Sequence, residues 1–305
     1  MCGWNSFTGR ILDCRVVVIT MGLDKFYTKD EVAKQCVQFL YETCPEAKDQ
    51  PCIEPSAGAG AFLPYLPTQT IAYDIAPEKP DIIEQDFLTL EPPQARTYTI
   101  VGNPPFGKRS RLAVQFFNHA AQFGDIIAFI LPVSFMKWSV QKQLASDFAL
   151  VAYRYLEPES FLCNGVPYSV RCVFQIWKRG GSINLRLKSA PPTLHPDFKL
   201  WQYNATPEAE RYIDEPWEYA VYRQGFKDYR KLFTQDDKEE VRKQMANGVQ
   251  FFFICPLTQE ARNFVENCDF ESLAARNTAI LGFGKADFIS YYMEKGDVKC
   301  HIASN

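Results

Sequence analysis

The stretch 97–107, with the sequence TYTIVGNPPFG, constrains this chain more than any other segment. An apolar, β-branched run stops abruptly there at Asn103-Pro104-Pro105-Phe106, and tandem prolines permit neither a helix nor further strand pairing. The pattern predicts a buried strand that ends at Asn103, with the side-chain amide and the next carbonyl groups fixed in direction. Phe106 adds a flat apolar surface beside them. We expect this turn to receive a planar amine; the alternative is a tight proline turn in which Phe106 only packs.

An NH2 group on an aromatic ring is a poor nucleophile, because its lone pair is delocalised into the ring. The amide oxygen of Asn103 and the carbonyl of Pro104 would accept hydrogen bonds from its two hydrogens and favour a tetrahedral nitrogen with a free lone pair. Methyl transfer to such a nitrogen then depends mainly on alignment with the methyl donor, and no strong base is required.

Two upstream segments are suited to hold such a donor. Apolar residues at helical spacing predict a helix over 30–41, with Thr28 or Asp30 as its cap and a free amino terminus that suits a carboxylate. The segment 51–62, PCIEPSAGAGAF, predicts a short strand and a small-residue turn where a ligand can approach the backbone. The turn lacks the Gly-Lys-Ser/Thr ending of a triphosphate loop.

The next predicted segments carry the acidic residues Asp74 and Asp86. The strand over 70–75 carries Asp74 at its end, where a carboxylate commonly accepts hydrogen bonds from a ribose diol. Asp86 is placed to accept from an adenine amino group, and Phe87 or Ile75 to sandwich the ring. Each of these residues alone is more often a turn acid or a core residue, so their order along the chain carries the prediction.

The remaining pattern alternates between helix and strand. A helix is predicted over 112–123, a buried parallel strand over 125–132, a loop and helix over 133–144, and further strands over 148–156 and 169–177. Such alternation predicts an α/β fold with a doubly wound, mostly parallel sheet, whose ligands lie at the carboxyl ends of the strands.

Composition narrows the class of protein. The 305 residues, 47% of them hydrophobic, suffice for one large core and a smaller second unit, and a net charge of −3 argues against unspecific coating of nucleic acid. No apolar run is long enough to span a membrane. The ten cysteines and three histidines show no metal-ligand spacing, so we expect reduced thiols, no metal and an intracellular protein, cytoplasmic or nuclear.

These segments, in this order, resemble the S-adenosylmethionine-dependent N6-adenine methyltransferases in which the cofactor motifs precede the catalytic one, over about residues 24–180. The resemblance implies S-adenosyl-L-methionine as the cofactor and a Rossmann-like class I methyltransferase fold. The predicted cofactor-binding residues are Phe26, Tyr27, Thr28, Glu54, Ser56, Ala57, Gly58, Gly60, Asp74, Ile75, Asp86 and Phe87. The predicted catalytic residues are Asn103, Pro104, Pro105 and Phe106, with Phe106 stacking on the extruded base.

The activity that this resemblance implies is methyl transfer to N6 of adenine in nucleic acid, with DNA favoured over RNA. Lys108, Arg109 and Arg111 directly follow the catalytic turn and are predicted to contact substrate phosphates, although an exposed helix start would look the same. The same motif occurs in enzymes that methylate protein glutamine at N5, which is the second hypothesis. A catalytically inactive binding module of the same fold is the third, and a partner subunit that supplies specificity stays open.

The chain divides into three predicted parts: an N-terminal extension over 1–22, a catalytic domain over 23–180 and a small α+β region over 181–305. The boundary falls at the Gly180-Gly181-Ser182 sequence. Between 201 and 231, aromatic and basic residues interleave, which suits either a nucleic-acid contact surface or a packed α+β core with basic side chains at its surface.

Overall fold

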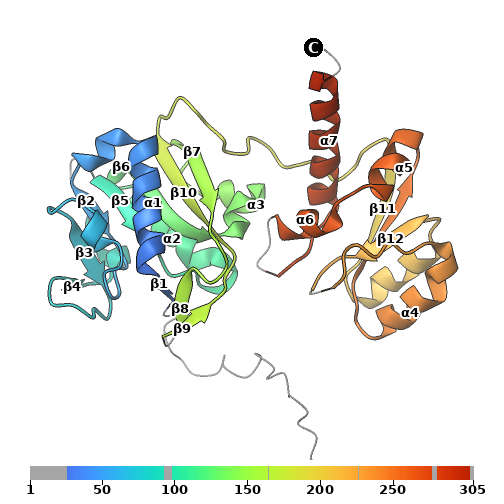
Figure 1. Cartoon of the computed structure of the whole chain (residues 1–305), viewed down its shortest axis with the longest axis horizontal. Helices are drawn as coiled ribbons and strands as arrows, with labels where there is room; N and C mark the ends of the chain where they lie inside the picture. The colour runs from blue at the N-terminus through green and yellow to red at the C-terminus, as the bar shows by residue number, and fades with distance from the viewer. Residues whose placement is uncertain (1–25, 93–97, 164, 226, 277–279, 303–305) are drawn as a thin grey trace, which may run out of the picture.

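A seven-stranded sheet forms the centre of the larger part of the molecule (Figure 1). The computed structural model describes residues 26–92, 98–163, 165–225, 227–276 and 280–302. The strands follow the order β4-β3-β2-β5-β6-β10-β7. Their bounds are Cys52–Glu54 (β2), Ile71–Asp74 (β3), Ile83–Glu84 (β4), Tyr98–Gly102 (β5), Gly124–Pro132 (β6), Phe148–Tyr155 (β7) and Cys172–Arg179 (β10).

The direction of the strands confirms the predicted Rossmann-like, doubly wound sheet. Neighbouring strands from β4 to β6 are parallel, whereas β10 is antiparallel to both β6 and β7. The chain runs outward from β2 through β3 to β4 and then continues on the other side from β5. The strand order therefore reverses between β2 and β5, which is where ligands bind in sheets of this kind.

Helices cover both faces of this sheet. On one face, Ile126, Ala128 and Ile130 of β6 belong to the same buried cluster as apolar residues of α1 (Asp30–Thr43). On the other face, the alternate residues Ile127 and Phe129 belong to a cluster with residues of α2 (Arg111–Ala120). This alternation explains why β6 reads as a continuous apolar run, because a strand buried on both faces has no polar side.

The predicted helix over 30–41 is confirmed as α1, but its predicted cap is wrong. Lys29 occupies the N-cap position without a side-chain hydrogen bond, while Thr28 and Asp30 have other partners. The other helices of this part are short. They are η1 (Pro45–Lys48), η2 (Leu63–Tyr65), η3 (Phe87–Thr89), η4 (Lys108–Ser110), η5 (Val133–Met136) and α3 (Trp138–Gln141).

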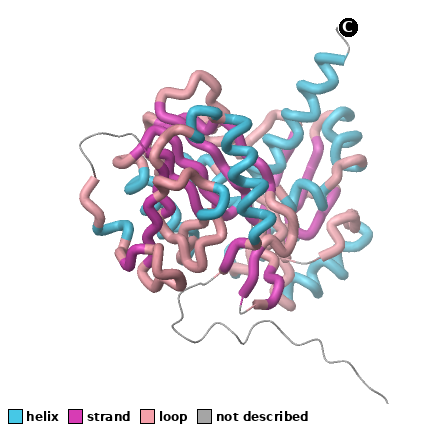
Figure 2. Tube along the Cα trace, turned by 60° about the vertical axis from the view of Figure 1, so that its left-hand side comes forward, coloured by secondary structure: helices cyan, strands magenta, loops and turns pink. Residues whose placement is uncertain are grey.

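A second, small sheet lies beside the large one in both views (Figures 1 and 2). It contains β1 (Tyr27–Thr28), β8 (Phe161–Cys163) and β9 (Val166–Tyr168) in antiparallel order. The pairing joins the segment before α1 to a hairpin far along the chain. No local pattern in either segment predicts this contact.

The C-terminal part has its own core around a three-stranded antiparallel sheet, in the order β11-β13-β12. Its elements are β11 (Phe198–Tyr203), η6 (Pro207–Asp214), β12 (Tyr219–Tyr222), η7 (Gln235–Asp237), α4 (Lys238–Ala246), β13 (Phe251–Pro256), α5 (Gln259–Glu266), α6 (Phe270–Ala275) and α7 (Lys285–Ile302). An antiparallel sheet together with helices confirms the predicted α+β character.

The aromatic residues between 201 and 231 mostly belong to this core. Tyr203, Trp217, Tyr222 and Tyr229 are buried, and the rings of Trp201, Tyr212 and Tyr219 pack against them. Nearby cations meet acidic partners, as in the ion pairs of Arg230 with Asp228 and of Lys231 with Glu240. The packed alternative is therefore observed, and the buried rings of this stretch do not form an exposed surface for bases.

No helix in the described part of the chain is long and apolar enough to cross a membrane. Over the same residues, no group of three or more His, Cys, Asp or Glu side chains gathers as a metal site. The seven described cysteines are free thiols. Burial raises the pKa of Cys36 and of Cys52 to about 12, so these thiols stay protonated at neutral pH.

Candidate active site

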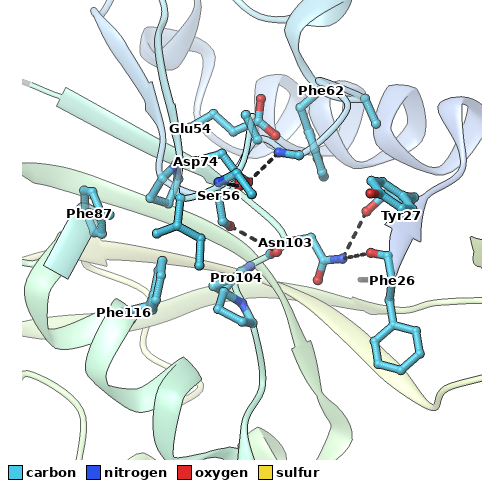
Figure 3. Close-up of a pocket in the computed structure, with 18 of the residues that line it drawn as sticks. Phe26, Tyr27, Glu54, Ser56, Phe62, Asp74, Phe87, Asn103, Pro104 and Phe116 are labelled. Carbon is cyan, nitrogen blue, oxygen red and sulfur yellow. Dashed lines mark hydrogen bonds between the residues drawn. The ribbon is translucent and has the colours of Figure 1, made fainter. Parts of the chain in front are cut away.

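A cavity of about 330 Å³ opens at the carboxyl ends of β2, β3 and β5, where the strand order reverses (Figure 3). All four predicted catalytic residues line it, from Asn103 to Phe106. Every predicted cofactor-binding residue except Gly60 also lines it. The predicted substrate-binding residues Lys108, Arg109 and Arg111 do not belong to its wall. The sequence motifs thus converge on one site.

Asn103 is held by contacts on three sides. Its Nδ2 donates hydrogen bonds to the Phe26 carbonyl at 3.3 Å and to Thr28 Oγ1 at 3.2 Å, and its own carbonyl accepts one from Ser56 Oγ at 3.2 Å. Figure 3 shows the amide between these neighbours. The buried Oδ1 has no partner among the described residues. Since both acceptors hold the nitrogen side, Oδ1 is an acceptor whose hydrogen bond is still to be made.

The turn after Asn103 has an unusual backbone. Gly107 adopts φ +65°, and a Cβ there would lie 2.7 Å from the Cβ of Leu112. Arg109 and Ser110 are also left-handed, at φ 55° and 62°, and Ser110 Oγ lies 2.8 Å from Ser134 Oγ. Such backbone conformations cost energy and persist only where neighbouring contacts enforce them. They bring the start of α2 directly onto the turn that follows Asn103.

Because of this turn, the three predicted phosphate contacts lie outside the cavity. Lys108, Arg109 and Arg111 are exposed at the start of α2, and none of them lines the cavity. The prediction that they bind substrate therefore has no support from the wall of the site, and any contact with phosphates would take place at the surface of the turn.

The glycine turn is tied to the acid at the end of β3. Gly58 adopts φ +53° and donates its N–H to Asp74 Oδ2 at 2.7 Å, and Ala76 N donates to Oδ1 at 2.8 Å. A Cβ on Gly58 would lie 3.5 Å from the Tyr27 ring. Each carboxylate oxygen of Asp74 keeps a second lone pair, so the group is oriented and can still accept hydrogen bonds from a diol.

Gly60 is the one predicted cofactor-binding residue that does not line the cavity. It is buried at φ +73°, and a Cβ there would lie 3.0 Å from Leu63 Cδ1 and 3.2 Å from Lys79 Nζ. This glycine allows close packing behind the turn rather than contact with a ligand.

Glu54 is a buried carboxyl group on the wall of the cavity. Its residue is 1% exposed, and Oε2 has no hydrogen-bond partner among the described residues. Burial, with a smaller effect of the Asp74 carboxylate, raises the pKa of Glu54 well above its usual range, and Lys79 opposes the rise. A carboxyl group in this state gains most from a ligand that brings a positive charge.

The far end of the cavity is formed by Asp86 and its neighbours. Asp86 Oδ1 accepts from Leu88 N at 2.9 Å and so caps η3, which leaves its other oxygen for a ligand. Phe87 is almost fully buried and stacks on Phe116 with ring centroids 5.7 Å apart, while Ile75 is half exposed. Phe87 and Ile75 both line the cavity, as the predicted sandwich requires.

Several wall residues were not predicted. Pro55, Ala59, Ala61 and Phe62 lie within the glycine segment, and proximity to it is the signal that would have identified them. Ala76, Leu88, Leu112 and Phe116 also line the cavity. For Leu112 and Phe116, helical spacing predicts only a buried face, because a residue that faces a cavity and one that faces a core look alike in sequence.

The charge of the wall distinguishes between classes of ligand. The acidic residues of the wall are Glu54, Asp74 and Asp86. Among the residues that the structure describes, no Lys, Arg or His lines the cavity. Asp74 and Asp86, with no base in this described wall, repel phosphate groups and attract cations, and a bound cation would also favour ionisation of Glu54. The cavity therefore suits a positively charged ligand with a diol better than a dinucleotide with its pyrophosphate.

Neither a protein-family model nor a curated protein sequence matches this chain. Several solved structures resemble it. One, provisionally described as an RNA methyltransferase from Pyrococcus horikoshii, is 14% identical over 52% of this chain and 87% of that one, with a TM-score of 0.43. A type I restriction-modification methyltransferase subunit from Streptococcus thermophilus is 13% identical over 84% and 59%, with a TM-score of 0.41. Magnesium protoporphyrin IX methyltransferase from Synechocystis, solved with bound S-adenosylmethionine, is 10% identical over 49% and 79%, with a TM-score of 0.37. Likeness at this level describes backbone topology and says nothing about the substrate of this chain.

Proposed function

We propose that this protein is an S-adenosyl-L-methionine-dependent methyltransferase that modifies the exocyclic N6 amine of adenine in nucleic acid, with DNA favoured over RNA. The observation that carries the proposal is the Asn103 amide. Its nitrogen is engaged by Phe26 and Thr28, and its buried oxygen is an acceptor without a partner among the described residues. Asn103 lines a cavity whose wall also holds the residues suited to the cofactor.

The wall fits the proposed cofactor by charge and by shape. S-adenosyl-L-methionine carries a sulfonium and an ammonium group, and when bound it supplies an electrophilic methyl group. Glu54 and Asp74 would face these positive charges and the ribose diol, and Asp86 with Ile75 and Phe87 would hold the adenine. Gly58, which is left-handed, puts no side chain between the turn and the Tyr27 ring.

Asn103 and Pro104 would hold the acceptor nitrogen. Oδ1 of Asn103 accepts one hydrogen from the NH2 group, and the Pro104 carbonyl accepts the other. Both acceptors are preorganised, because the prolines fix the backbone and two hydrogen bonds fix the amide. With its two hydrogens held in this way, the nitrogen would present its lone pair to the methyl group, and Phe106 at the cavity wall would pack against the ring.

The test uses labelled cofactor and four kinds of acceptor: single-stranded DNA, duplex DNA, RNA and a protein extract. We expect label in N6-methyladenine of nucleic acid, identified by mass spectrometry. Asn103→Ala should lower methyl transfer about a hundredfold or more, which is the usual cost of losing one preorganised polar group. It should leave cofactor affinity, measured by calorimetry, close to that of the wild type.

Asn247→Ala is the matched control, because Asn247 is an exposed asparagine at the end of α4 in the C-terminal part. It should transfer methyl groups at the wild-type rate. Full activity of Asn103→Ala would refute the proposed mechanism. Label in protein glutamine alone would show that the substrate is a protein. A lack of cofactor affinity would show that the chain is a catalytically inactive binding module.

A further inference from the structure

The small sheet of β1, β8 and β9 extends the wall that holds Asn103. Thr28 pairs with Phe161, and Phe161 pairs with Tyr168, so the three residues form one row across the strands. Residues directly opposite in neighbouring strands point to the same face of a sheet. Tyr168 therefore shares a face with Thr28, whose hydroxyl accepts the hydrogen bond from Asn103. Two strand spacings place Tyr168 about 10 Å from Thr28.

Tyr168 carries an aromatic ring that is stacked but open to solvent. Its ring lies 4.8 Å from that of Phe26, at an interplanar angle of 17°, and the residue is 43% exposed. Phe26 lines the cavity, and its carbonyl accepts from Asn103. The pair therefore connects the catalytic amide to an aromatic surface outside the cavity.

The segment that carries Tyr168 bears little negative charge. From Ser160 to Lys178 the chain has no acidic residue and contains Arg171, while Glu157 and Glu159 directly precede this stretch. The catalytic turn adds three exposed cations, Lys108, Arg109 and Arg111. Proteins bind single-stranded nucleic acid through flat rings together with exposed cations, since bases stack on rings and phosphates meet cations.

We propose that the Phe26–Tyr168 pair is a stacking platform for the nucleobase next to the target adenine, in a single-stranded segment of the substrate. This inference rests on the proposed function and adds a recognition surface to it. An extruded target base leaves its neighbour outside the cavity, and the platform offers this neighbour a ring on which to stack. Stacking accepts any base, so the platform strengthens binding without selecting a sequence.

The experiment starts from single-stranded DNA and RNA oligonucleotides that contain one adenine between random flanks. The wild-type protein and labelled cofactor identify the methylated members. In one such member, 2-aminopurine then replaces the base on either side of the adenine, and its fluorescence reports stacking. We expect binding of the wild-type protein to quench 2-aminopurine at one of the two positions.

Variants separate stacking from a structural role of Tyr168. Tyr168→Leu should abolish the quenching and raise KM for the oligonucleotide roughly tenfold, a typical effect of one base–aromatic stack. Its affinity for S-adenosyl-L-methionine should match the wild type. Tyr168→Phe keeps the ring and should restore both quenching and KM. Tyr153→Leu is the control, because Tyr153 is another exposed tyrosine, on β7, and it should behave like the wild type.

The inference and the proposed function fail in different ways. If no oligonucleotide is methylated, the proposed function is refuted and this inference falls with it. If methylation occurs but neither 2-aminopurine is quenched, or if Tyr168→Leu keeps the wild-type KM, the platform alone is refuted.

Discussion

Replacement of the buried carboxyl group by an amide, Glu54→Gln, should change how the stability of the protein depends on pH. Glu54 is 1% exposed, and its pKa is raised well above its usual value of 4.5, first by burial and second by Asp74. The other charged or titratable neighbours are Lys79, which opposes the rise, and the thiol of Cys52 on the same strand. The folded protein therefore keeps a proton on Glu54 at pH values where the unfolded chain has released it.

The sign and size of the effect follow from this difference in bound protons. Below the unfolded pKa both states are protonated, and Glu54 has no pH-dependent effect. As the pH rises from there toward the raised pKa of the folded protein, the free energy of unfolding falls by about 1.4 kcal/mol per pH unit. Glutamine cannot ionise, so the variant escapes this loss. We expect the free energy of unfolding of the variant, relative to that of the wild type, to rise by about 1.4 kcal/mol for each pH unit in that window.

Urea unfolding at pH 5.5, 6.5 and 7.5 measures this gain. The difference between wild type and variant removes the contributions of groups common to both proteins, including those of the C-terminal core. Glu84→Gln on β4 is the control, since it removes an exposed carboxylate from the same sheet. A stability difference between wild type and Glu54→Gln that stays constant over this range would refute the argument.

Three further predictions concern neighbouring residues. Thr28→Val removes one hydrogen-bond acceptor for Asn103 Nδ2. Loss of one hydrogen bond costs about 1.4 kcal/mol, so methyl transfer should become about tenfold slower. An unchanged rate would show that Phe26 alone orients the amide. Gly107→Ala forces a side chain into φ +65° against Leu112 and should cost about 2 kcal/mol in thermal unfolding; a wild-type Tm would contradict this. With pKa values raised to about 12, the thiols of Cys36 and Cys52 should resist iodoacetamide at pH 8 until the protein is unfolded, as peptide mapping would detect.

The strands and helices that form the cavity could be predicted because their signals are local. The apolar runs before Asp74 and Asn103 end at residues that stop a strand, and these strands are found as β3 and β5. Helical spacing likewise marks α1 and most of α2. Parallel strands bring their carboxyl ends to one edge, so the motifs at those ends meet in space.

Contacts between distant segments could not be predicted in this way. Thr28 looks like a helix cap in the sequence, but strand pairing with β8 turns its hydroxyl toward Asn103. Arg109 and Ser110 have left-handed backbones, and neither residue type indicates this conformation in a sequence as glycine does. They belong to the turn in which Lys108, Arg109 and Arg111 are exposed. The aromatic stretch in the C-terminal part is ambiguous for the same reason, because composition does not show which partner a ring meets.

The hydrogen bonds from Asn103 to Phe26 and Thr28 have a consequence for the order in which the protein folds during synthesis on the ribosome. The turn that bears Asn103 is synthesised well before β8, the strand that pairs with β1. A nascent chain that ends before residue 161 contains every motif of the proposed site but lacks the strand that anchors Phe26 and Thr28. We expect such a chain to leave the Asn103 amide without its fixed orientation, so that catalytic competence arises only after the β8–β9 hairpin leaves the exit tunnel.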